Sequence, residues 1–427
     1  METSCSDCWF AWTARALAAS LAGMLSVCVP LHAQVGSRAE EAPEPPPFRV
    51  GPLVVAPTLT LEDLGWDSNV LHLWEDPETA GDFTTTVTPD VRSWLRFGPA
   101  RLRTHSTVDF MYFRDHASER SVDQTHEGRL EVRLGRLMPH VSGRWLRTRR
   151  RFGFEIDERT RRYERSLAAG ADVRLGLRTT VEFSARRSSV EFDRTDSLSD
   201  PLVSDFYDGT SRGITLAVRH ELTPVTSAAL TVNKSRDRFD LDPSRDSESL
   251  GIGAAFEFEP TAVISGRAYL GWLRVNLIEP GSPPFGGVAA SVNLTYTLLG
   301  STLITVEANR DVSYSAIRGQ HAYLFEGGRV LIRHRLNETW DIGGRVGRHE
   351  LSYGLFGREV SLGDPVPGGL VGYHETVTEY AGEVGFRAGP QTRLGFTLGR
   401  QQRHSVAGPT RGYERVRAGL SITYRFR

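Results

Sequence analysis

The chain has 427 residues, and its 51 Lys and Arg residues nearly balance its 52 Asp and Glu residues, for a net charge of -1. A nucleic-acid-binding surface needs a basic excess, so this balance excludes a nucleic-acid partner from our expectations. A charged fraction of 24% and a mean hydropathy of -0.31 leave no uncharged apolar stretch long enough for a membrane helix beyond the first 33 residues. Any membrane-embedded part must therefore be built of strands.

Residues 1–33 are typical of a secretory signal peptide. Arg15 precedes the apolar run 16–29, and Ala33 is a small residue suited to cleavage. The three cysteines of the sequence all lie in this leader, so we expect the exported chain to have no disulfide and no cysteine metal site. The sequence thus predicts an exported protein.

Residues 34–48 are acidic and rich in proline, which predicts an extended, solvated linker. From residue 49 to residue 427, segments of alternating apolar and polar residues recur, each bounded by Gly, Pro, Asn or Asp. The clearest is 288–298, where apolar residues occupy the even positions and polar residues most odd ones. Such alternation indicates strands whose two faces have different surroundings.

Strands are predicted near 50–61, 82–97, 101–113, 124–134, 140–147, 162–175, 178–192, 212–222, 226–236, 247–258, 262–275, 287–298, 302–312, 326–335, 339–351, 375–388, 392–402 and 413–426. Their number is even, as in bacterial single-chain barrels, and the last strand ends in aromatic residues. The predicted fold class is all-β, a transmembrane antiparallel β-barrel of about 18 strands.

The connections alternate between tight turns, such as 98–100 and 389–391, and longer polar loops, such as 62–81, 193–211 and 352–374. One rim with short turns and one with long loops is expected of an outer-membrane barrel and not of a β-sandwich. The segment 352–374 is rich in turn-forming residues and is our candidate for a loop that narrows the lumen.

A barrel of this size is too wide for side chains to fill, so the apolar faces must meet lipid and the polar faces must line water. The candidate pore-lining residues are Arg103, Asp109, Arg129, Glu131, Arg133, Asp172, Arg174, Arg267, Glu307, Arg345, Arg393 and Arg417. Collectively they would orient polar or anionic solutes, whereas individually most would simply pair across neighbouring strands. Outward aromatics near strand ends would form two girdles: Phe97, Phe258, Trp340, Phe386 and Tyr424 at the tight turns, and Phe83, Tyr112 and Trp272 at the long loops.

Two prolines interrupt the predicted strands. Pro57 and Pro89 lack the backbone N–H that a β-ladder needs, so we expect bulges or strand ends at both.

No motif for catalysis is present, and His105, His126 and His349 stand alone, so we expect polar wall residues there and no enzyme. The acidic loops 193–200 and 237–246 could offer oxygen ligands to Ca²⁺, but their arginines argue against it. We therefore expect no metal and no cofactor.

The N-terminal strand and the first loop carry a family resemblance. Residues 57–61, then Trp66-Asp67-x-Asn69-Val70, then a Phe83-x-Thr-x-x-x-Pro89 element resemble the opening of the β-barrel porins often found beside exopolysaccharide export systems. The motif match covers 57–97, and the rest matches by barrel pattern and size. The resemblance implies an outer-membrane pore that passes a polysaccharide chain and works with periplasmic export proteins.

The leading hypothesis is thus a passive conduit for exopolysaccharide in the Gram-negative outer membrane. The alternatives are a general diffusion porin for small polar solutes and a non-conducting barrel that serves as an adhesin. The sequence leaves the oligomeric state open.

Overall fold

The computed structural model describes residues 48–74, 77–195, 203–278, 284–317, 321–354, 359–360, 374–405 and 411–426. The expected signal peptide and all of the expected linker except Phe48 lie outside these residues, so both stay predictions.

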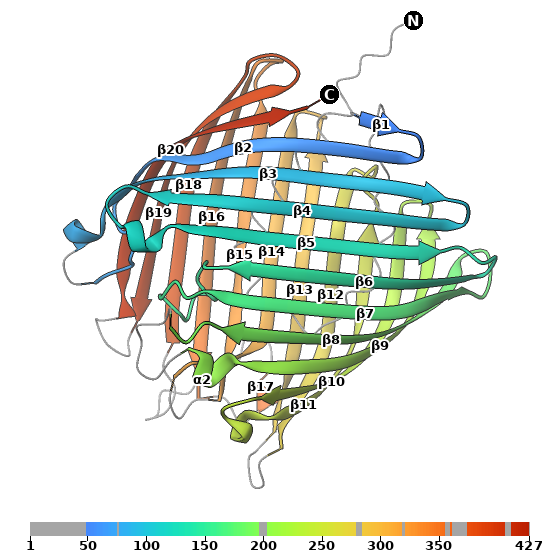
Figure 1. Ribbon diagram of the computed structural model, residues 1–427. Helices are drawn as coiled ribbons and strands as arrows, with labels where there is room; N and C mark the ends of the chain where they lie inside the picture. Colours follow the sequence, from blue (N-terminus) through green and yellow to red (C-terminus); the bar gives the residue numbers. More distant parts are fainter. Residues whose placement is uncertain are drawn as a thin grey trace, which may run out of the picture.

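One sheet contains all the strands of the described chain (Figure 1). The first half of the wall consists of β2 (Leu53–Asp67), β3 (Asp82–Phe97), β4 (Ala100–Phe113), β5 (Ser121–Val132), β6 (Leu137–Thr148), β7 (Arg162–Arg174), β8 (Thr179–Phe192), β9 (Gly209–Thr223) and β10 (Thr226–Phe239). The second half consists of β11 (Ser247–Phe258), β12 (Ile264–Leu277), β13 (Phe285–Leu298), β14 (Thr302–Tyr314), β15 (Ala322–Arg335), β16 (Trp340–Tyr353), β18 (His374–Arg387), β19 (Thr392–Ser405) and β20 (Tyr413–Arg425). Two short strands are added to this wall, β1 (Phe48–Val50) on β2 and β17 (Glu359–Val360) on β13.

The sheet closes on itself. Each long strand pairs antiparallel with the next one along the chain, and β20 pairs back onto β2 from Thr58↔Arg425 to Asp67↔Arg417. Of the twenty strands, all but β1 and β17 form this ring, which confirms an all-β antiparallel barrel of 18 strands. Closure gives every strand a neighbour on both sides, so the wall has no open edge.

Helical structure in the described chain is confined to single turns. These are η1 (Pro77–Ala80), η2 (Ala117–Glu119), α2 (Ser204–Tyr207) and η3 (Pro243–Arg245), all in the longer loops. No helix among the described residues has the length and apolar character needed to cross a membrane.

The two rims differ in the length of their connections. At the short-turn rim, Phe97 pairs with Ala100 across the β3–β4 turn, where Gly98 adopts a φ of 57° that favours glycine. At the opposite, long-loop rim, the connections are longer and contain η2, α2 and η3. The barrel therefore has the alternation of short and long connections that the sequence predicts.

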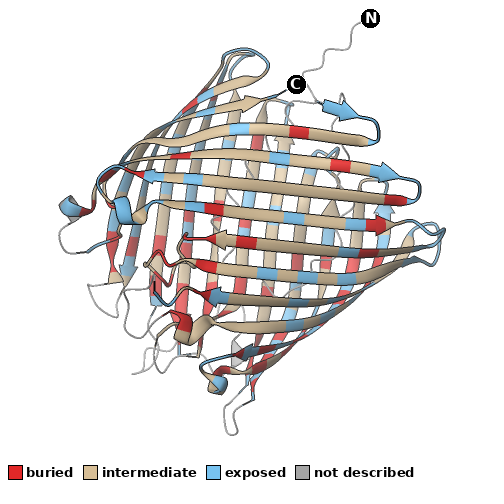
Figure 2. Ribbon diagram, viewed as in Figure 1, coloured by how far each residue is buried: buried red, intermediate tan, exposed pale blue. Residues whose placement is uncertain are grey.

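The outer surface of the barrel is apolar. On β9, Ile214, Leu216 and Val218 are about half exposed, whereas Ala217 between them is 1% exposed on the inner face. Buried and exposed positions alternate in this way along many strands (Figure 2). An apolar outer face on a closed barrel is the arrangement that contact with lipid requires.

The prolines do not produce the expected bulges, and this prediction was wrong. Pro57 pairs with Val91 and Pro89 with Leu59 in continuous register. The effect of Pro89 is limited to a gap in the β3–β4 ladder beside Thr88, with the register unchanged on either side. The bulge lies further along β2, between Leu61 and Gly65.

The end of the β14–β15 hairpin leaves the wall. Pairing between β13 and β14 stops at Ala290↔Arg310, whereas β14 and β15 remain paired to Tyr314↔Ala322. Leu324 alternates onto the same face of β15 as the lipid-facing Ile332, yet it is 2% exposed and packs in one cluster with Phe285 and Tyr269, which lie on the inner face of β13 and β12. The β14–β15 tip, residues 311–317 and 321–325, therefore bends into the barrel.

Candidate pore and the segments that cross it

The candidate pore-lining residues lie on one face of the wall. All except Arg133 fall within strands, on the face opposite the exposed apolar residues. Arg133 lies just past the end of β5, where it is exposed, and Arg174 is exposed as the last residue of β7. Both arginines therefore sit at the short-turn rim and not along the lumen.

Most of these charges form ion pairs between strands. Arg103 and Arg129 both reach Glu131, at 2.8 and 2.7 Å, and this carboxylate is 2% exposed. Arg393 lies 2.6 Å from both Asp341 and Glu383. The remaining partners are Glu257 for Arg267 (3.2 Å), Glu379 for Arg345 (3.7 Å), His140 for Asp172 (3.8 Å), Arg329 for Glu307 and Asp63 for Arg417. The geometry favours the pairing interpretation for individual residues, and their contribution to solute passage stays a prediction.

The residues of the family-like motif have structural roles at the long-loop rim. The Asp67 carboxylate accepts hydrogen bonds from Arg415 Nε at 2.8 and 2.9 Å, which ties β2 to β20. Asn69, fully buried, donates to the carbonyls of Leu73 (2.8 Å) and Glu414 (3.0 Å). Val70 donates its backbone N–H to Ala80 (2.7 Å). The motif thus fixes the loop beside the seam where the barrel closes.

The two aromatic members of the motif lie on the outside. Trp66 is 53% exposed and Phe83 is 37% exposed, and the two residues pair across β2 and β3. Pro89 lies six residues further along β3 and shares the outward face with Phe83. This placement agrees with the expected aromatic girdle at the long-loop rim.

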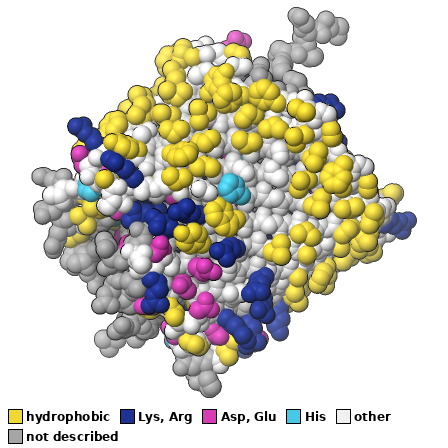
Figure 3. Space-filling model, in the orientation of Figure 1, with side chains coloured by type: hydrophobic (Ala, Val, Ile, Leu, Met, Phe, Trp, Pro, Cys, Tyr) yellow, Lys and Arg dark blue, Asp and Glu magenta, His cyan; other side chains and the backbone are white. Residues whose placement is uncertain are grey.

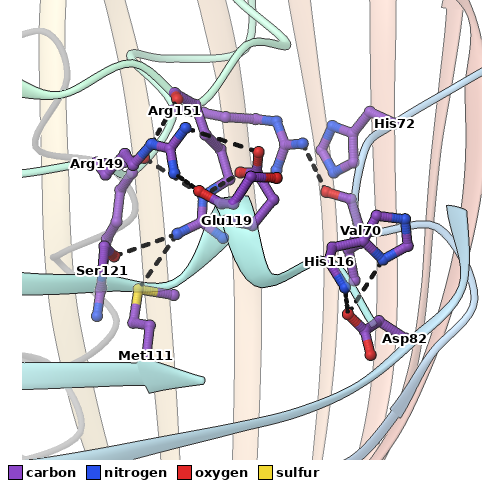
Figure 4. A network of polar contacts seen from close by, with 12 residues as sticks. Val70, His72, Asp82, Met111, His116, Glu119, Ser121, Arg149 and Arg151 are labelled. Atoms are coloured by element: carbon purple, nitrogen blue, oxygen red, sulfur yellow. Dashed lines mark hydrogen bonds and ion pairs between the residues drawn. The ribbon is translucent and has the colours of Figure 1, made fainter. Parts of the chain in front are cut away.

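The β6–β7 connection, residues 149–161, folds into the lumen, and we call it the plug loop. Arginines attach it to its own side of the barrel. Arg149 lies 3.8 Å from Glu119 (Figure 4). Arg159 lies 3.6 Å from the same Glu119 and stacks over the Phe113 ring at 4.6 Å. A third arginine, Arg150, forms a 2.6 Å ion pair with Asp109 on the inner face of β4. One predicted pore-lining residue therefore holds the plug loop in place.

The plug loop also contacts the seam between β2 and β20. Arg151 donates to the Val70 carbonyl at 2.7 Å, a contact visible in Figure 4. His72 lies 3.4 Å from the Asp157 carboxylate and stacks on Tyr413 with ring centroids 3.9 Å apart. Burial lowers the pKa of Arg151 to about 10 and lowers that of His72 well below its usual value. His72 is therefore neutral at pH 7.

The far end of the plug loop reaches the opposite wall. Arg403 on β19, whose side chain is fully buried, lies 2.6 Å from Asp157 and forms a second ion pair with Glu375 on β18. Phe154 stacks on His349 of β16, with ring centroids 4.7 Å apart. Because a single loop touches β4, β16 and β19, it must cross the barrel.

Glu155 lies where the closing segments meet. Its carboxylate accepts hydrogen bonds from the Tyr207 hydroxyl (2.8 Å), the Ala316 N–H (2.8 Å) and the Ser315 hydroxyl. The Glu155 carbonyl accepts a further bond from Arg411 at 3.1 Å. Burial raises the pKa of Glu155, and the three donors to its carboxylate act against that shift. Glu155 thus joins the plug loop, α2 and the β14–β15 tip.

The β14–β15 tip is fixed to a third sector of the wall. The Tyr314 hydroxyl donates to Asp237 on β10 at 2.6 Å, and it lies 2.5 Å from the Ser247 hydroxyl on β11. Arg245, 1% exposed, donates to the carbonyls of His321 (3.1 Å) and Phe206 (3.0 Å). Two inward-folded segments therefore lie across the lumen near the long-loop rim.

The sequence pattern does not single out the plug loop and points to 352–374 instead. Almost all of 352–374 lies outside the described residues, so its role stays untested. The sequence of the plug loop is rich in arginine and is typical of a solvated connection. The signal that would have found it is the alternation of Phe152, Phe154 and Ile156, because apolar side chains in a long loop need a surface to pack on.

The isolated histidines make ordinary polar contacts. His105 bonds to Asp90 and lies 3.3 Å from Thr107, while His126 contacts Ser106 at 3.1 Å and stacks on Trp145. Among the described residues, no group of three or more His, Cys, Asp or Glu side chains could hold a metal ion.

Solved structures that match this chain include OpdO and OpdK of Pseudomonas aeruginosa. The alignment with OpdO covers 87% of this chain and 96% of the OpdO chain, at 11% identity and a TM-score of 0.46. The alignment with OpdK, solved with vanillate, covers 87% of this chain and 98% of the OpdK chain, at 10% identity and a TM-score of 0.45. A bacterial polysaccharide outer membrane secretin also covers 87% and 98% at 10% identity, with a TM-score of 0.34. No curated protein matches this sequence.

A family model described as Putative beta-barrel porin 2 matches residues 42–426, which include the whole described barrel. With eighteen strands, an apolar outer face and short and long connections at opposite rims, the fold is that of a bacterial outer-membrane pore. The chain therefore belongs to this porin family and is an outer-membrane β-barrel in contact with lipid.

Proposed function

We propose that the barrel is a passive conduit for exopolysaccharide, closed at its outer mouth by the plug loop until a chain displaces it. The observation that carries this proposal is the nature of the closure, in which hydrogen bonds and ion pairs hold two folded segments across the lumen. Such contacts can be exchanged for contacts with a hydroxyl-rich polymer, which offers donors and acceptors along its whole length.

The charges along the inner wall support the same function. A solute moves through a channel when it is bound well enough to enter and weakly enough to leave, at several successive sites. Here the arginines are already paired with carboxylates, as in the Arg103, Arg129 and Glu131 group. Paired charges present many weak hydrogen-bonding sites to sugar hydroxyls and carboxylates, without one deep binding site that would trap a chain.

Polymer block in planar bilayers tests the proposal. A variant in which residues 152–158 are replaced by two glycines should conduct steadily, and a linear uronic acid polymer should interrupt its current for longer than a neutral sugar monomer does. The matched control is Arg194→Gln, which removes an exposed ion pair with Asp205 at 3.3 Å outside the plug loop. If the opened barrel conducts small ions but no polymer interrupts the current, polysaccharide export is refuted.

A general diffusion porin is the second candidate, and the charged plug loop inside the lumen favours it. The Arg150–Asp109 ion pair places both signs of charge beside the passage. In this case the wild type would conduct small ions steadily, and deleting 152–158 would raise conductance while leaving polymer block absent. A barrel that stays closed in both forms would instead favour the adhesin alternative.

A further inference from the structure

The lipid-facing surface of the barrel has an uncommon cluster of cations near the long-loop rim. We call it the basic strip, and it consists of Arg165 on β7, Arg187 on β8, Arg212 on β9, and Lys234, Arg236 and Arg238 on β10. All six lie on the outward face of their strands. The outward face also carries exposed apolar residues: Leu167 beside Arg165 on β7, and Phe183, Leu216 and Leu230 on β8, β9 and β10. In Figure 3, basic side chains lie over this part of the barrel, next to the hydrophobic surface, with some acidic side chains nearby.

The register of the strands places like charges directly opposite one another. Arg187 pairs with Arg212 across β8 and β9, and Arg212 pairs with Arg236 across β9 and β10. Like charges in directly opposed positions destabilise a sheet. Three arginines in a row across three strands therefore repel one another, and an anion bound in front of them would relieve this repulsion.

Few carboxylates are available to neutralise the strip. Within the described ranges, Glu248 lies 3.6 Å from Arg236, and both side chains are more than 40% exposed. Glu191 shares the outward face of β8 but stands four residues nearer the long loop than Arg187. Such exposed pairs are weak, so most of the positive charge remains for an external partner.

The strip stands at the border of the apolar surface. On β9 the lipid-facing side chains from Ile214 to Leu222 are apolar except for His220. At about 3.3 Å per residue and a tilt near 40° they rise about 20 Å, close to the roughly 25 Å apolar band of such barrels. Arg212 is the next outward position beyond Ile214. It therefore lies at the level of lipid headgroups on the long-loop side, which faces outside in bacterial barrels.

We propose that the basic strip is a binding site for the phosphates of a phosphorylated glycolipid in the outer leaflet. Arginine guanidinium groups bind phosphate oxygens through two parallel hydrogen bonds, and adjacent arginines can share one phosphate. The apolar residues below the strip, including Leu216 and Leu230, receive the acyl chains of the same molecule. The combination of opposed arginines and apolar surface favours a lipid over a free phosphate ion.

Native mass spectrometry of the full-length exported protein tests the site. The probes are a diphosphorylated diglucosamine lipid, the same lipid without phosphates, and inorganic phosphate. The triple variant Arg187→Gln, Arg212→Gln, Arg236→Gln should bind the phosphorylated lipid at least about tenfold more weakly than the wild type, because each charged hydrogen bond contributes roughly a tenfold factor. The double variant Arg348→Gln, Arg400→Gln is the matched control, since both arginines are exposed on the outward face of β16 and β19.

The control should keep wild-type affinity, and the dephosphorylated lipid should bind the wild type as weakly as the phosphorylated lipid binds the triple variant. Should the triple variant fail to form a heat-modifiable barrel on gels, the single variant Arg212→Gln replaces it, with a smaller loss of the same sign. Equal binding of both lipids, equal binding by the triple variant, or binding of inorganic phosphate as tight as that of the lipid would each overturn the proposal.

Discussion

Replacing Arg403 with methionine should open the mouth of the barrel. The Arg403 side chain is fully buried and holds two acids at once, Glu375 of the neighbouring strand and Asp157 of the plug loop. Methionine is shorter and uncharged, so it fills part of the same space but makes neither ion pair. The substitution therefore removes a link between the plug loop and the far wall and leaves the barrel strands paired.

The loss of free energy depends on which partners Glu375 and Asp157 keep after the substitution. Removing one partner of a buried ion pair costs about 3–5 kcal/mol when the other charge is left alone. Here Glu375 keeps a 2.5 Å contact with Arg411, and Asp157 is 32% exposed, so the loss should fall below that range, at about 2 kcal/mol. A change of about 2 kcal/mol shifts the equilibrium between docked and undocked plug loop roughly 30-fold.

Single-channel recording in planar bilayers measures this shift as open time. Arg403→Met should spend roughly 30-fold longer open relative to closed than the wild type, and Arg403→Lys should lie between, because lysine keeps the charge without the planar fork. The control is Arg400→Met on the same strand, which loses a surface pair with Glu414 at 2.9 Å whose side chains are both about half exposed. If Arg403→Met and Arg400→Met have the same open time, the ion pair does not hold the plug loop shut.

Asn69→Ala should lower the free energy of unfolding by about 2–3 kcal/mol in urea titrations, because it removes three partly buried hydrogen bonds to the backbone of Leu73 and Glu414. An unchanged midpoint would contradict the proposed role of the motif. Burial raises the pKa of Asp208, in the loop before β9, from 3.8 to about 6, so the folded state prefers the protonated acid. Stability should therefore fall as pH rises from about 4 to 6, and Asp208→Asn should remove that part of the pH dependence of thermal unfolding. Gly385→Ala would place a Cβ 2.5 Å from Asp341 Oδ1 and against the Arg393 guanidinium, so it should destabilise the barrel. Gly382→Ala on the same strand meets nothing within 4 Å and should leave stability unchanged. Equal melting temperatures for the two variants would refute this prediction.

The strands were predictable because two simple signals coincide along the chain. The strict alternation of β13 and β20 separates an apolar face from a polar one, and turn residues such as those at 98–100 mark where each strand must end. The first strand was predicted too short, since Glu62 and Asp63 interrupt the pattern and resemble the start of a loop. The structure resolves this with a bulge, in which Asp63 adopts a φ of 53° and β2 continues to Asp67.

The inward folding at the long-loop rim was not predictable from the same signals. Val312 and Leu324 fit the outward apolar pattern of β14 and β15, but bending of the hairpin turns this face onto the inner side of β13. Alternation reports that a face is apolar and not what covers it. The sequence predicts that charged residues of neighbouring strands pair across the wall. It does not predict that Glu155 bonds to α2 and the β14–β15 tip, because these contacts join residues far apart in sequence.

The seam between β2 and β20 has a consequence for biogenesis. Because β2 pairs with β20, one edge of β2 stays unpaired until the residues of β20 have been synthesised and exported. Its proline at position 57 and its bulge at Asp63 interrupt the row of hydrogen-bonding groups along that edge. Irregular edges of this kind discourage pairing with foreign strands, so features that perturb the finished wall protect the nascent chain from aggregation.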